Sequence, residues 1–402
     1  MSTGLRRPEQ PGETHGRSRL PRRNLLAVVL LLAAILAVAA WWSVSSPSWP
    51  ARLIIRTGGL SLDEFEKQPV TARSRLCVPQ AVSPDGKTLL AAHGGSAVLL
   101  DTVTGRETAR WAMPGGRDIY QACFSPDGRT VAAITRGPVG QNLTADLVDV
   151  SSGKIRTSLP TPGVGIVHGG LAFMDGGEVL RVLVQDGQNR LVAIEVDVSS
   201  GRETARRTLS CRSPQSTTHA SPDGRQVAIA TTPFARGVQL PELTDVVLWD
   251  AEQDREATRI AGSTAVTTIT VSDDGTTVAI GRTGGAIEVW DVATRTRRAM
   301  FHPHRTGFAP RMLWLSPDGS ALASLAMLSS GPLSLDGLRW RVAAMSGRAS
   351  MPPDELSLLD ASRGELLLRT RDESVPCFSG DGRIIATLHR DGTILLRDMH
   401  QP

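Results

Sequence analysis

Residues 123–134 read CFSPDGRTVAAI, a Ser-Pro-Asp-Gly turn between two short apolar stretches. Proline presets its own φ and glycine accepts a positive φ, so this tetrapeptide suits a tight turn between two strands. The same tetrapeptide occurs three more times and looser versions occur three times. The seven final glycines are Gly86, Gly128, Gly177, Gly224, Gly275, Gly319 and Gly382. Their spacings of 42, 49, 47, 51, 44 and 63 residues predict seven copies of one structural unit.

Each unit continues with a third apolar stretch that ends in an aspartate. These aspartates are Asp101, Asp149, Asp197, Asp250, Asp291, Asp360 and Asp398. A second turn and a more polar stretch follow, as at 102–106 and 107–111. Four short strands in about 45 residues are typical of a propeller blade, so we expect an all-β, seven-bladed β-propeller over residues 52–402. We interpret the aspartates as turn caps, because this side chain accepts backbone N–H groups two residues on.

The repeat resembles that of the WD-repeat family over about residues 76–402. The shared features are the Ser-Pro-Asp-Gly turn, the apolar strand after it, and the Trp-Asp ending at 249–250 and 290–291. Five repeats lack the tryptophan, and no Gly-His pair precedes a blade; His304 stands near the family's histidine position. The chain is identified as a divergent, bacterial-type, membrane-anchored member. The resemblance implies a non-enzymatic scaffold that binds a protein or peptide, while these losses leave the family's Asp–His–Ser–Trp hydrogen-bond network open.

Ring closure is also predicted, because the chain ends just after the third strand of the seventh unit. A fourth strand must come from elsewhere, or that blade keeps an exposed edge. Residues 52–57 (RLIIRT), or a stretch nearer 69–75, are the candidates for that strand.

Extra residues between the second and third strands of some units indicate where the candidate binding surface lies. From each turn glycine to its strand-closing aspartate the gaps are 15, 21, 20, 26, 16, 41 and 16 residues, so units two, three, four and six carry extra residues. All these segments are expected to open on one face. The longest loop, about 327–355, holds Arg339, Trp340 and Arg341, and the fourth unit's loop holds Phe234 and Arg236. Trp and Arg dominate binding hot spots, so these five residues are the predicted partner contacts, with a local anchor as the other reading of Trp340.

The N-terminal 51 residues differ from the repeats. Residues 1–23 are a basic tail, and residues 25–42 (LLAVVLLLAAILAVAAWW) carry no charge. We expect a single transmembrane helix over 24–42 and a Ser/Pro-rich linker over 43–51. The arginines before the span place the tail in the cytoplasm and the propeller outside it. A cleaved signal peptide is the alternative, because Ala37-Val38-Ala39 resembles a cleavage site.

The distribution of charge and the missing motifs exclude several classes of function. Residues 1–50 hold six arginines and two glutamates, +6 − 2 = +4, which is the net charge of the whole chain. Residues 51–402 therefore carry a net charge of about zero, which disfavours nucleic-acid binding. No nucleophile elbow, P-loop or Rossmann fingerprint occurs, so we expect no enzyme, no cofactor and no metal site. The alternative is an extracytoplasmic lactonase-type hydrolase with a metal at the central channel. Cys77, Cys123, Cys211 and Cys377 are read as buried thiols or as disulfide partners.

Overall fold

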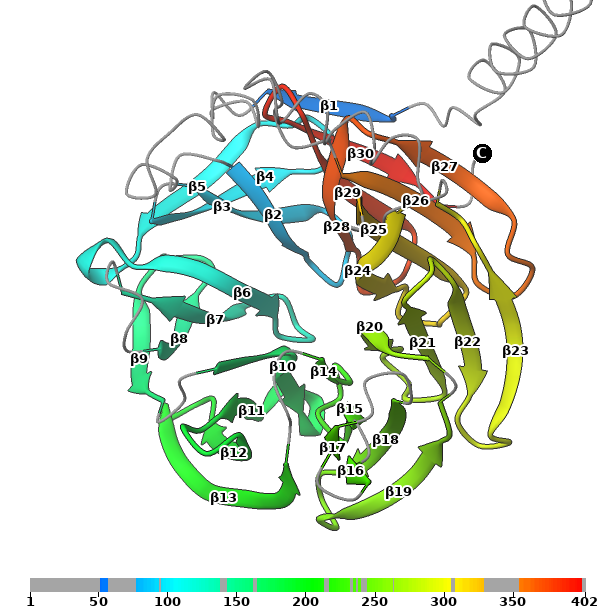
Figure 1. The fold of residues 1–402 in the computed structure, drawn as a ribbon. Helices are drawn as coiled ribbons and strands as arrows, with labels where there is room; N and C mark the ends of the chain where they lie inside the picture. Colours follow the sequence, from blue (N-terminus) through cyan, green and yellow to red (C-terminus); the bar gives the residue numbers. More distant parts are fainter. Residues whose placement is uncertain are drawn as a thin grey trace, which may run out of the picture. The chain divides into compact units, whose positions relative to one another are not determined.

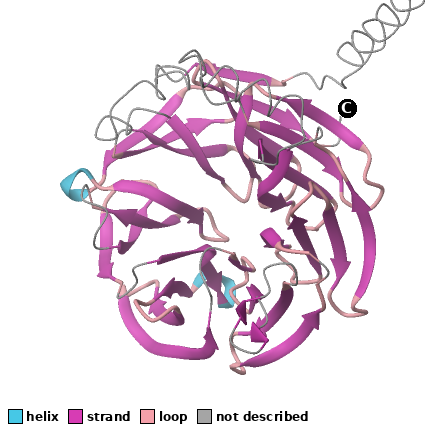
Figure 2. Ribbon diagram, in the orientation of Figure 1, coloured by secondary structure: helices cyan, strands magenta, loops and turns pink. Residues whose placement is uncertain are grey.

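The computed structural model describes residues 51–56, 77–93, 95–137, 143–161, 165–212, 217–231, 234–235, 238–239, 244–262, 264–304, 308–328 and 354–399. The blades belong to one compact unit, Pro47–Pro402. Figure 1 shows the sheets arranged radially around a common centre, and Figure 2 shows that nearly all described elements are strands. The expected all-β, seven-bladed propeller is therefore confirmed.

Blades 1 to 6 each use four strands that are consecutive along the chain, apart from an extra hairpin within blade 4. Blade 1 contains β2 (Cys77–Val82), β3 (Thr88–His93), β4 (Ser96–Asp101) and β5 (Glu107–Ala112). Blade 2 contains β6 (Asp118–Phe124), β7 (Thr130–Arg136), β8 (Leu143–Asp149) and β9 (Ile155–Pro160). Blade 3 contains β10 (Gly165–Met174), β11 (Val179–Gln185), β12 (Arg190–Asp197) and β13 (Arg202–Arg212).

The second half of the ring follows the same order. Blade 4 contains β14 (Thr218–Ala220), β15 (Gln226–Thr231), β18 (Asp245–Asp250) and β19 (Arg255–Ile260), with the small hairpin β16 (Phe234–Ala235) and β17 (Val238–Gln239) between β15 and β18. Blade 5 contains β20 (Val266–Val271), β21 (Thr277–Arg282), β22 (Ile287–Asp291) and β23 (Thr296–Phe301). Blade 6 contains β24 (Phe308–Leu315), β25 (Ala321–Leu328), β26 (Glu355–Asp360) and β27 (Leu366–Thr370).

Blade 7 joins the two ends of the propeller. It contains β28 (Glu373–Phe378), β29 (Ile384–His389) and β30 (Thr393–Asp398), and its outermost strand is β1 (Leu53–Arg56). β1 runs antiparallel to β30, with Leu53 opposite Leu396 and Arg56 opposite Thr393. The first of the two predicted closing segments therefore completes the ring, and 69–75 lies outside the described residues.

The Ser-x-Asp-Gly turn has one repeated geometry. In blade 1 the Ser83 hydroxyl donates to Asp85 Oδ1 at 2.7 Å and accepts from the Thr88 N–H at 2.9 Å. Gly86 has φ +70°, which explains why glycine ends the turn. The same pair of serine bonds recurs in every other blade except blade 3, where a 3-10 turn, η3 (Asp175–Gly177), takes its place.

Seven hydrophobic clusters form the core, and each lies between two neighbouring blades. The second strand of every blade is buried on both faces, as with Leu89 and Leu90 of β3, both 0% exposed. Blades 3 and 4 are also linked through one parallel backbone bridge, between His168 and His219. Removing this apolar surface from water is the main force that holds the blades in a ring.

The predicted transmembrane span, 24–42, lies outside the described residues, as do the tail 1–23 and most of the linker 43–51. The described helical elements are η3 and the 3-10 turn η2 (Pro114–Gly116). No helix in the described part of the chain is long and apolar enough to cross a membrane.

Candidate interaction faces

The two faces of the ring differ in their connections. The first-to-second and third-to-fourth strand turns lie on one side, here called the turn face. Backbone bonds join them within each blade, such as Thr102 N–H to Lys87 O at 2.9 Å. The second-to-third connections and the links between blades lie on the opposite side, here called the loop face.

Six of the seven repeated aspartates cap turns on the turn face, as predicted, and the residues after 399, which follow Asp398, lie outside the described residues. Asp101 Oδ1 accepts the Val103 and Thr104 N–H groups at 3.1 and 2.6 Å. The Ser200 hydroxyl and N–H hold the pKa of Asp197 down at about 2, and the Thr294 N–H and Arg298 do the same for Asp291. These carboxylates are therefore already satisfied by their own turns.

The longest second-to-third strand connections lie on the loop face. Residues 329–354 join β25 to β26, residues 232–244 join β15 to β18, and residues 137–142 join β7 to β8. The expected insertion in blade 3 is wrong, because the β11–β12 turn spans only 186–189, the same length as 283–286 in blade 5. Its extra residues lengthen the strands instead, since β11 has 7 residues and β12 has 8.

The predicted contact residues fall on these loops. Arg339, Trp340, Arg341 and Arg236 lie outside the described residues. Phe234 begins β16, whose pairing with Gln239 of β17 builds a hairpin in the loop of blade 4. The structure thus places the backbone of one of the five residues on the loop face and leaves the contact role of all five as a prediction.

His304 contributes to a buried polar cluster in blade 6. Its Nε2 lies 2.7 Å from Ser324 Oγ, and its Nδ1 lies 3.4 Å from Glu355 Oε1 and 3.3 Å from Ser357 Oγ. The side chains of His304 and Glu355 are 0% and 1% exposed. A histidine–serine contact therefore exists in this blade, with a glutamate beside it that sequence reasoning missed. His302, two residues before His304, is exposed, so these two histidine side chains lie in different surroundings.

Other blades contain buried ion pairs that the sequence did not reveal. In blade 5, Arg282 Nη2 lies 3.1 Å from Glu288 Oε2, which also accepts Trp290 Nε1–H at 3.1 Å. In blade 7, Arg397 makes two bonds to the Glu373 carboxylate at 2.6 and 2.7 Å. All four charged side chains of these two pairs are less than a tenth exposed, with values of 2%, 7%, 5% and 6%. Such pairs fix local geometry, and breaking one leaves an uncompensated buried charge.

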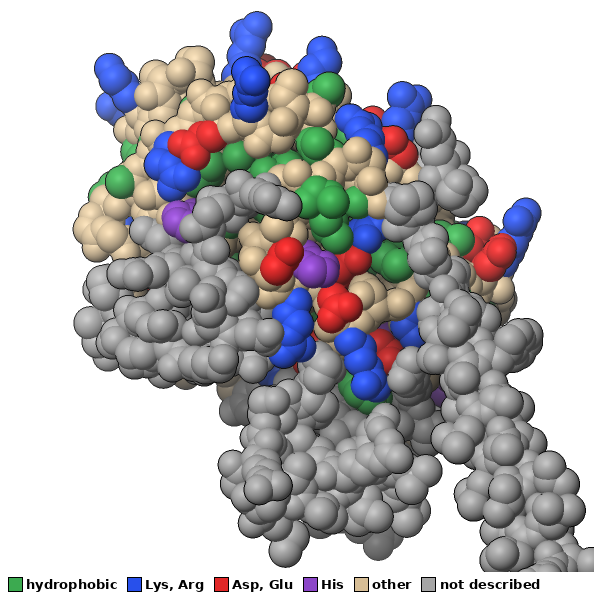
Figure 3. Space-filling model, turned by 90° about the horizontal axis from the view of Figure 1, so that it is seen from above, with side chains coloured by type: hydrophobic (Ala, Val, Ile, Leu, Met, Phe, Trp, Pro, Cys, Tyr) green, Lys and Arg blue, Asp and Glu red, His purple; other side chains and the backbone are tan. Residues whose placement is uncertain are grey.

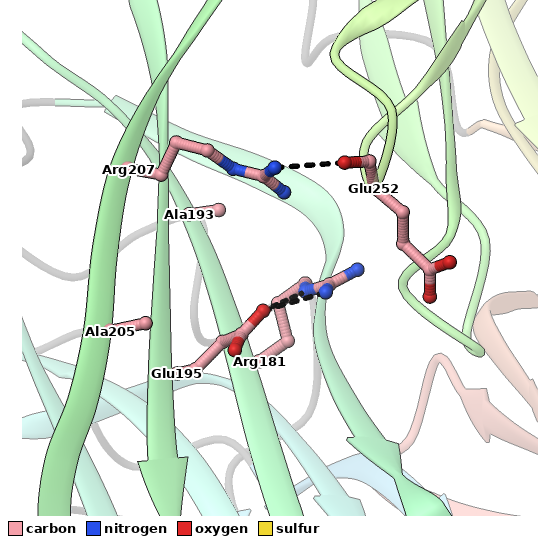
Figure 4. A pocket seen from close by; sticks show the side chains of 6 residues that line it. All are labelled: Arg181, Ala193, Glu195, Ala205, Arg207 and Glu252. Carbon is pink, nitrogen blue, oxygen red and sulfur yellow. Dashed lines mark hydrogen bonds and ion pairs between the residues drawn. The ribbon is translucent and has the colours of Figure 1, made fainter.

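A cavity of about 350 Å³ lies between blades 3 and 4, and Figure 4 shows the side chains that line it. Arg181 Nη2 lies 2.6 Å from Glu195 Oε1, and Arg207 Nη1 donates to the Glu252 carbonyl at 2.8 Å. The small side chains of Ala193 and Ala205 also line the cavity and leave its volume unfilled. Arg181 Nη1 also donates to the Gly224 carbonyl of blade 4 at 2.8 Å, so each of the two arginines joins blade 3 to blade 4.

Within the described residues, no group of three or more His, Cys, Asp or Glu side chains is placed to hold a metal ion. The four cysteines are present as thiols. Burial raises the pKa of Cys123 and of Cys377 to about 12, so both thiols stay protonated near neutral pH.

Solved structures with the same arrangement of strands were found. The β-propeller domain of Cps50 (Swd1) from Myceliophteria thermophila is 12% identical with a TM-score of 0.58, and the match covers 88% of this chain and 100% of that one. The fold is a β-propeller. A chain in the crystal structure of the Mitotic Checkpoint Complex is 14% identical with a TM-score of 0.54, and the match covers 100% of this propeller chain and 98% of that one. At such identities the likeness establishes the fold alone.

No protein-family model matches the propeller sequence, and a search of curated proteins also gives no match.

Proposed function

We propose that this divergent, bacterial-type propeller is a non-enzymatic, membrane-anchored scaffold that binds a protein or peptide partner on its loop face. The observation that carries the proposal is the difference between the two faces. Turn-face connections are short and internally bonded, whereas the longest second-to-third strand connections, 232–244 and 329–354, leave the loop face. Variable loops on a rigid ring are where binding residues are usually found.

The structural neighbours are consistent with this role. One of them is a chain of an assembly that is named as a complex. In the chain described here, Arg339, Trp340 and Arg341 on the longest loop and Phe234 and Arg236 on the blade 4 loop remain the proposed contacts.

Site-specific photocrosslinking in native membranes tests the loop face. A benzophenone amino acid replaces Trp340 or Phe234 on the loop face, and Glu252 on the turn face serves as the matched control. We expect both loop-face positions to give one shared protein adduct that is missing from position 252. Adducts of equal yield at all three positions, or none at 340 and 234, would refute the proposal.

The contact residues are tested separately. Changing Arg339, Trp340 and Arg341 together to alanine is expected to lower the adduct yield from position 234 by about tenfold or more, since hot-spot residues contribute at least about 1.4 kcal/mol. An unchanged yield would remove these three residues from the binding surface. Stoichiometric metal in the purified protein would instead favour the hydrolase alternative.

The proposed topology has the tail in the cytoplasm and the propeller on the other side of the membrane. It rests on the apolar run 25–42 and on the arginines before it. Protease added to sealed, right-side-out membranes is expected to reach loop 329–353. Complete protection of that loop, with digestion only after the membranes are opened, would contradict this topology.

A further inference from the structure

The face of blade 3 that packs on blade 4 departs from the pattern of the ring. Arg181 of β11 stands directly opposite Glu195 of β12, which is two positions before the closing aspartate. In the other six blades the corresponding pair is apolar and buried. These pairs are Leu90 and Leu99, Ala132 and Leu147, Ala228 and Leu248, Ala279 and Val289, Ala323 and Leu358, and Ala386 and Leu396. Blade 3 therefore has an ion pair where every other blade has an apolar contact.

The outermost strand of blade 3 adds a second arginine to this face. Arg207 of β13 stands opposite Ala193, which is four positions before the closing aspartate. The residue at the place of Arg207 is apolar in the other blades, except for a threonine in blade 6. These residues are Trp111, Leu159, Ile260, Phe301, Thr370 and Ile55. A buried ion pair is usually no more stabilising than the apolar packing it replaces, and such a local break in a repeat is expected at a functional site.

These charged side chains line the cavity of about 350 Å³ between blades 3 and 4 (Figure 4). Pockets that bind small molecules have volumes of about 300–1,000 Å³, so this one suits a small ligand. The Arg181 side chain is 4% exposed and that of Glu195 is 30% exposed, whereas Ala205 is fully accessible on β13. The cavity therefore opens to solvent beside β13 and extends inward to Arg181.

Arg181 has two N–H groups left for a ligand. It donates through Nε and Nη2 to Glu195 Oε1, at 3.2 and 2.6 Å, and through Nη1 to Gly224 O at 2.8 Å. A guanidinium has five N–H groups, and these bonds use three of them. The Arg181–Glu195 pair is neutral as a whole, so it neither attracts nor repels an ion strongly.

Arg207 has three unused N–H groups and no carboxylate partner in the described part of the chain. Its two bonds go to the carbonyls of Glu252, at 2.8 Å, and of Ala251. The Asp254 carboxylate interacts with Arg207 only at longer range, and it accepts the Ser210 N–H at 2.8 Å instead. The cavity therefore contains one guanidinium whose charge is not paired.

Several arginines on the outer strands are paired, in contrast to Arg207. Arg110 lies 2.6 Å from Glu107, and Figure 3, which looks onto the rim that carries β1, shows several Lys and Arg side chains beside Asp or Glu side chains. The Glu252 carboxylate, at the edge of the cavity, lies 3.5 Å from Arg225. An unpaired guanidinium attracts an anion, and its planar shape favours a carboxylate bound through two parallel hydrogen bonds.

We propose that this cavity, here called the blade 3–4 pocket, binds a small carboxylic acid with a short hydrocarbon chain. The carboxylate of the ligand accepts unused N–H groups of Arg207 and Arg181, and its hydrocarbon part lies against the methyl groups of Ala193 and Ala205. Phosphate offers a similar charge but nothing to the methyl groups, so it is the weaker ligand. The pocket is separate from the loop-face contacts, and the proposal depends neither on the protein partner nor on the membrane anchor.

Isothermal titration calorimetry tests the proposal on the full-length chain in detergent. Succinate is the probe, inorganic phosphate and butylamine are the comparison probes, and titration into detergent buffer gives the background. We expect one succinate to bind per chain with a Kd below about 1 mM. Phosphate should bind at least about tenfold more weakly, and butylamine, a cation, should give no saturable heat.

Two variants block the pocket in different ways. Ala205→Leu fills its opening and keeps both arginines, and the equivalent place in blade 6 already has a leucine, Leu368. Arg207→Leu removes the unpaired guanidinium and introduces an apolar residue, as most other blades have there. Arg206→Leu is the matched control, because Arg206 is paired with Glu203 at 2.6 Å and does not line the cavity.

We expect Ala205→Leu and Arg207→Leu each to raise the Kd for succinate by about tenfold or more, and Arg206→Leu to change it by less than about twofold. A cooperative thermal transition shows that each variant is folded, and Ala205→Leu decides the matter if Arg207→Leu is not. No saturable heat at millimolar succinate, or binding that survives Ala205→Leu, would overturn the proposal. Phosphate that binds as tightly as succinate would overturn it too, because charge alone would then be recognised.

Discussion

At the scale of single residues, one turn departs from its siblings in a way that affects stability. Asp273 stands where four of the other turns have proline, and its N–H donates to Pro317 O of blade 6 at 3.2 Å. Burial raises the pKa of Asp273 from 3.8 to about 6, and the carboxylates of Asp223, Asp274 and Asp318 add to the effect. The folded state therefore takes up a proton here more readily than the unfolded chain.

Asp273→Asn is expected to stabilise the protein at neutral pH. Because the folded pKa is raised, the native carboxyl group costs nothing below about pH 4 and its full penalty above about pH 6. The gain should be about 1–3 kcal/mol near pH 7.5 and should vanish near pH 3.5, measured as the free energy of unfolding in urea. Asp274→Asn is the control: its pKa is lowered, Ser272 donates to it at 2.6 Å, and its loss should destabilise. A gain that does not depend on pH would contradict the assignment.

Buried ion pairs are the second feature at this scale. Glu288→Gln leaves the Arg282 guanidinium, 2% exposed, without its carboxylate. The expected loss is about 3–5 kcal/mol of unfolding free energy. Glu256→Gln is the control, because its 2.6 Å pair with Arg259 is 39% and 47% exposed and should contribute less than about 1 kcal/mol. Equal losses in the two variants would show that burial does not govern these pairs.

At the scale of elements, the closing strand depends on one side chain. Ile55 is 3% exposed and belongs to the hydrophobic cluster between blades 7 and 1, whereas Ile54 beside it faces outward. Ile55→Ala is expected to cost about 2–5 kcal/mol, as large-to-small core changes do. Ile54→Ala should change the free energy of unfolding by less than about 0.5 kcal/mol. Urea denaturation of both variants in detergent measures the difference, and similar costs would contradict the alternation along β1.

Turns and strands were largely predictable from sequence because they depend on local residue types. Gly86 at positive φ, Asp101 as a turn cap and the RLIIRT closing strand all follow from such rules. The blade 3 insertion was wrong because a residue count cannot separate longer strands from a longer loop. The buried pairs were missed because their partners follow no repeat: Arg282 and Glu288 are 6 positions apart, Glu373 and Arg397 are 24 apart.

At the scale of the whole molecule, closure makes the N-terminal residues part of the folded ring. A chain starting at residue 47 keeps β1 and is expected to be monomeric with one cooperative unfolding transition. A chain starting at residue 57 leaves β30 as an unpaired edge, which favours aggregation. Size-exclusion chromatography and thermal unfolding measure the difference. A monomeric, equally stable chain from residue 57 would show that blade 7 does not need β1.

The pairing of Leu53 with Leu396 also orders events during biosynthesis. β1 leaves the ribosome before every other described strand, and its partner β30 leaves after all of them. Six blades can assemble before β30 is made, but the seventh must wait for that strand. If the chain is exported as it is made, this last step takes place on the far side of the translocation channel. Until then blade 7 is incomplete and β1 has no partner strand, and that interval is when protection by a chaperone matters most.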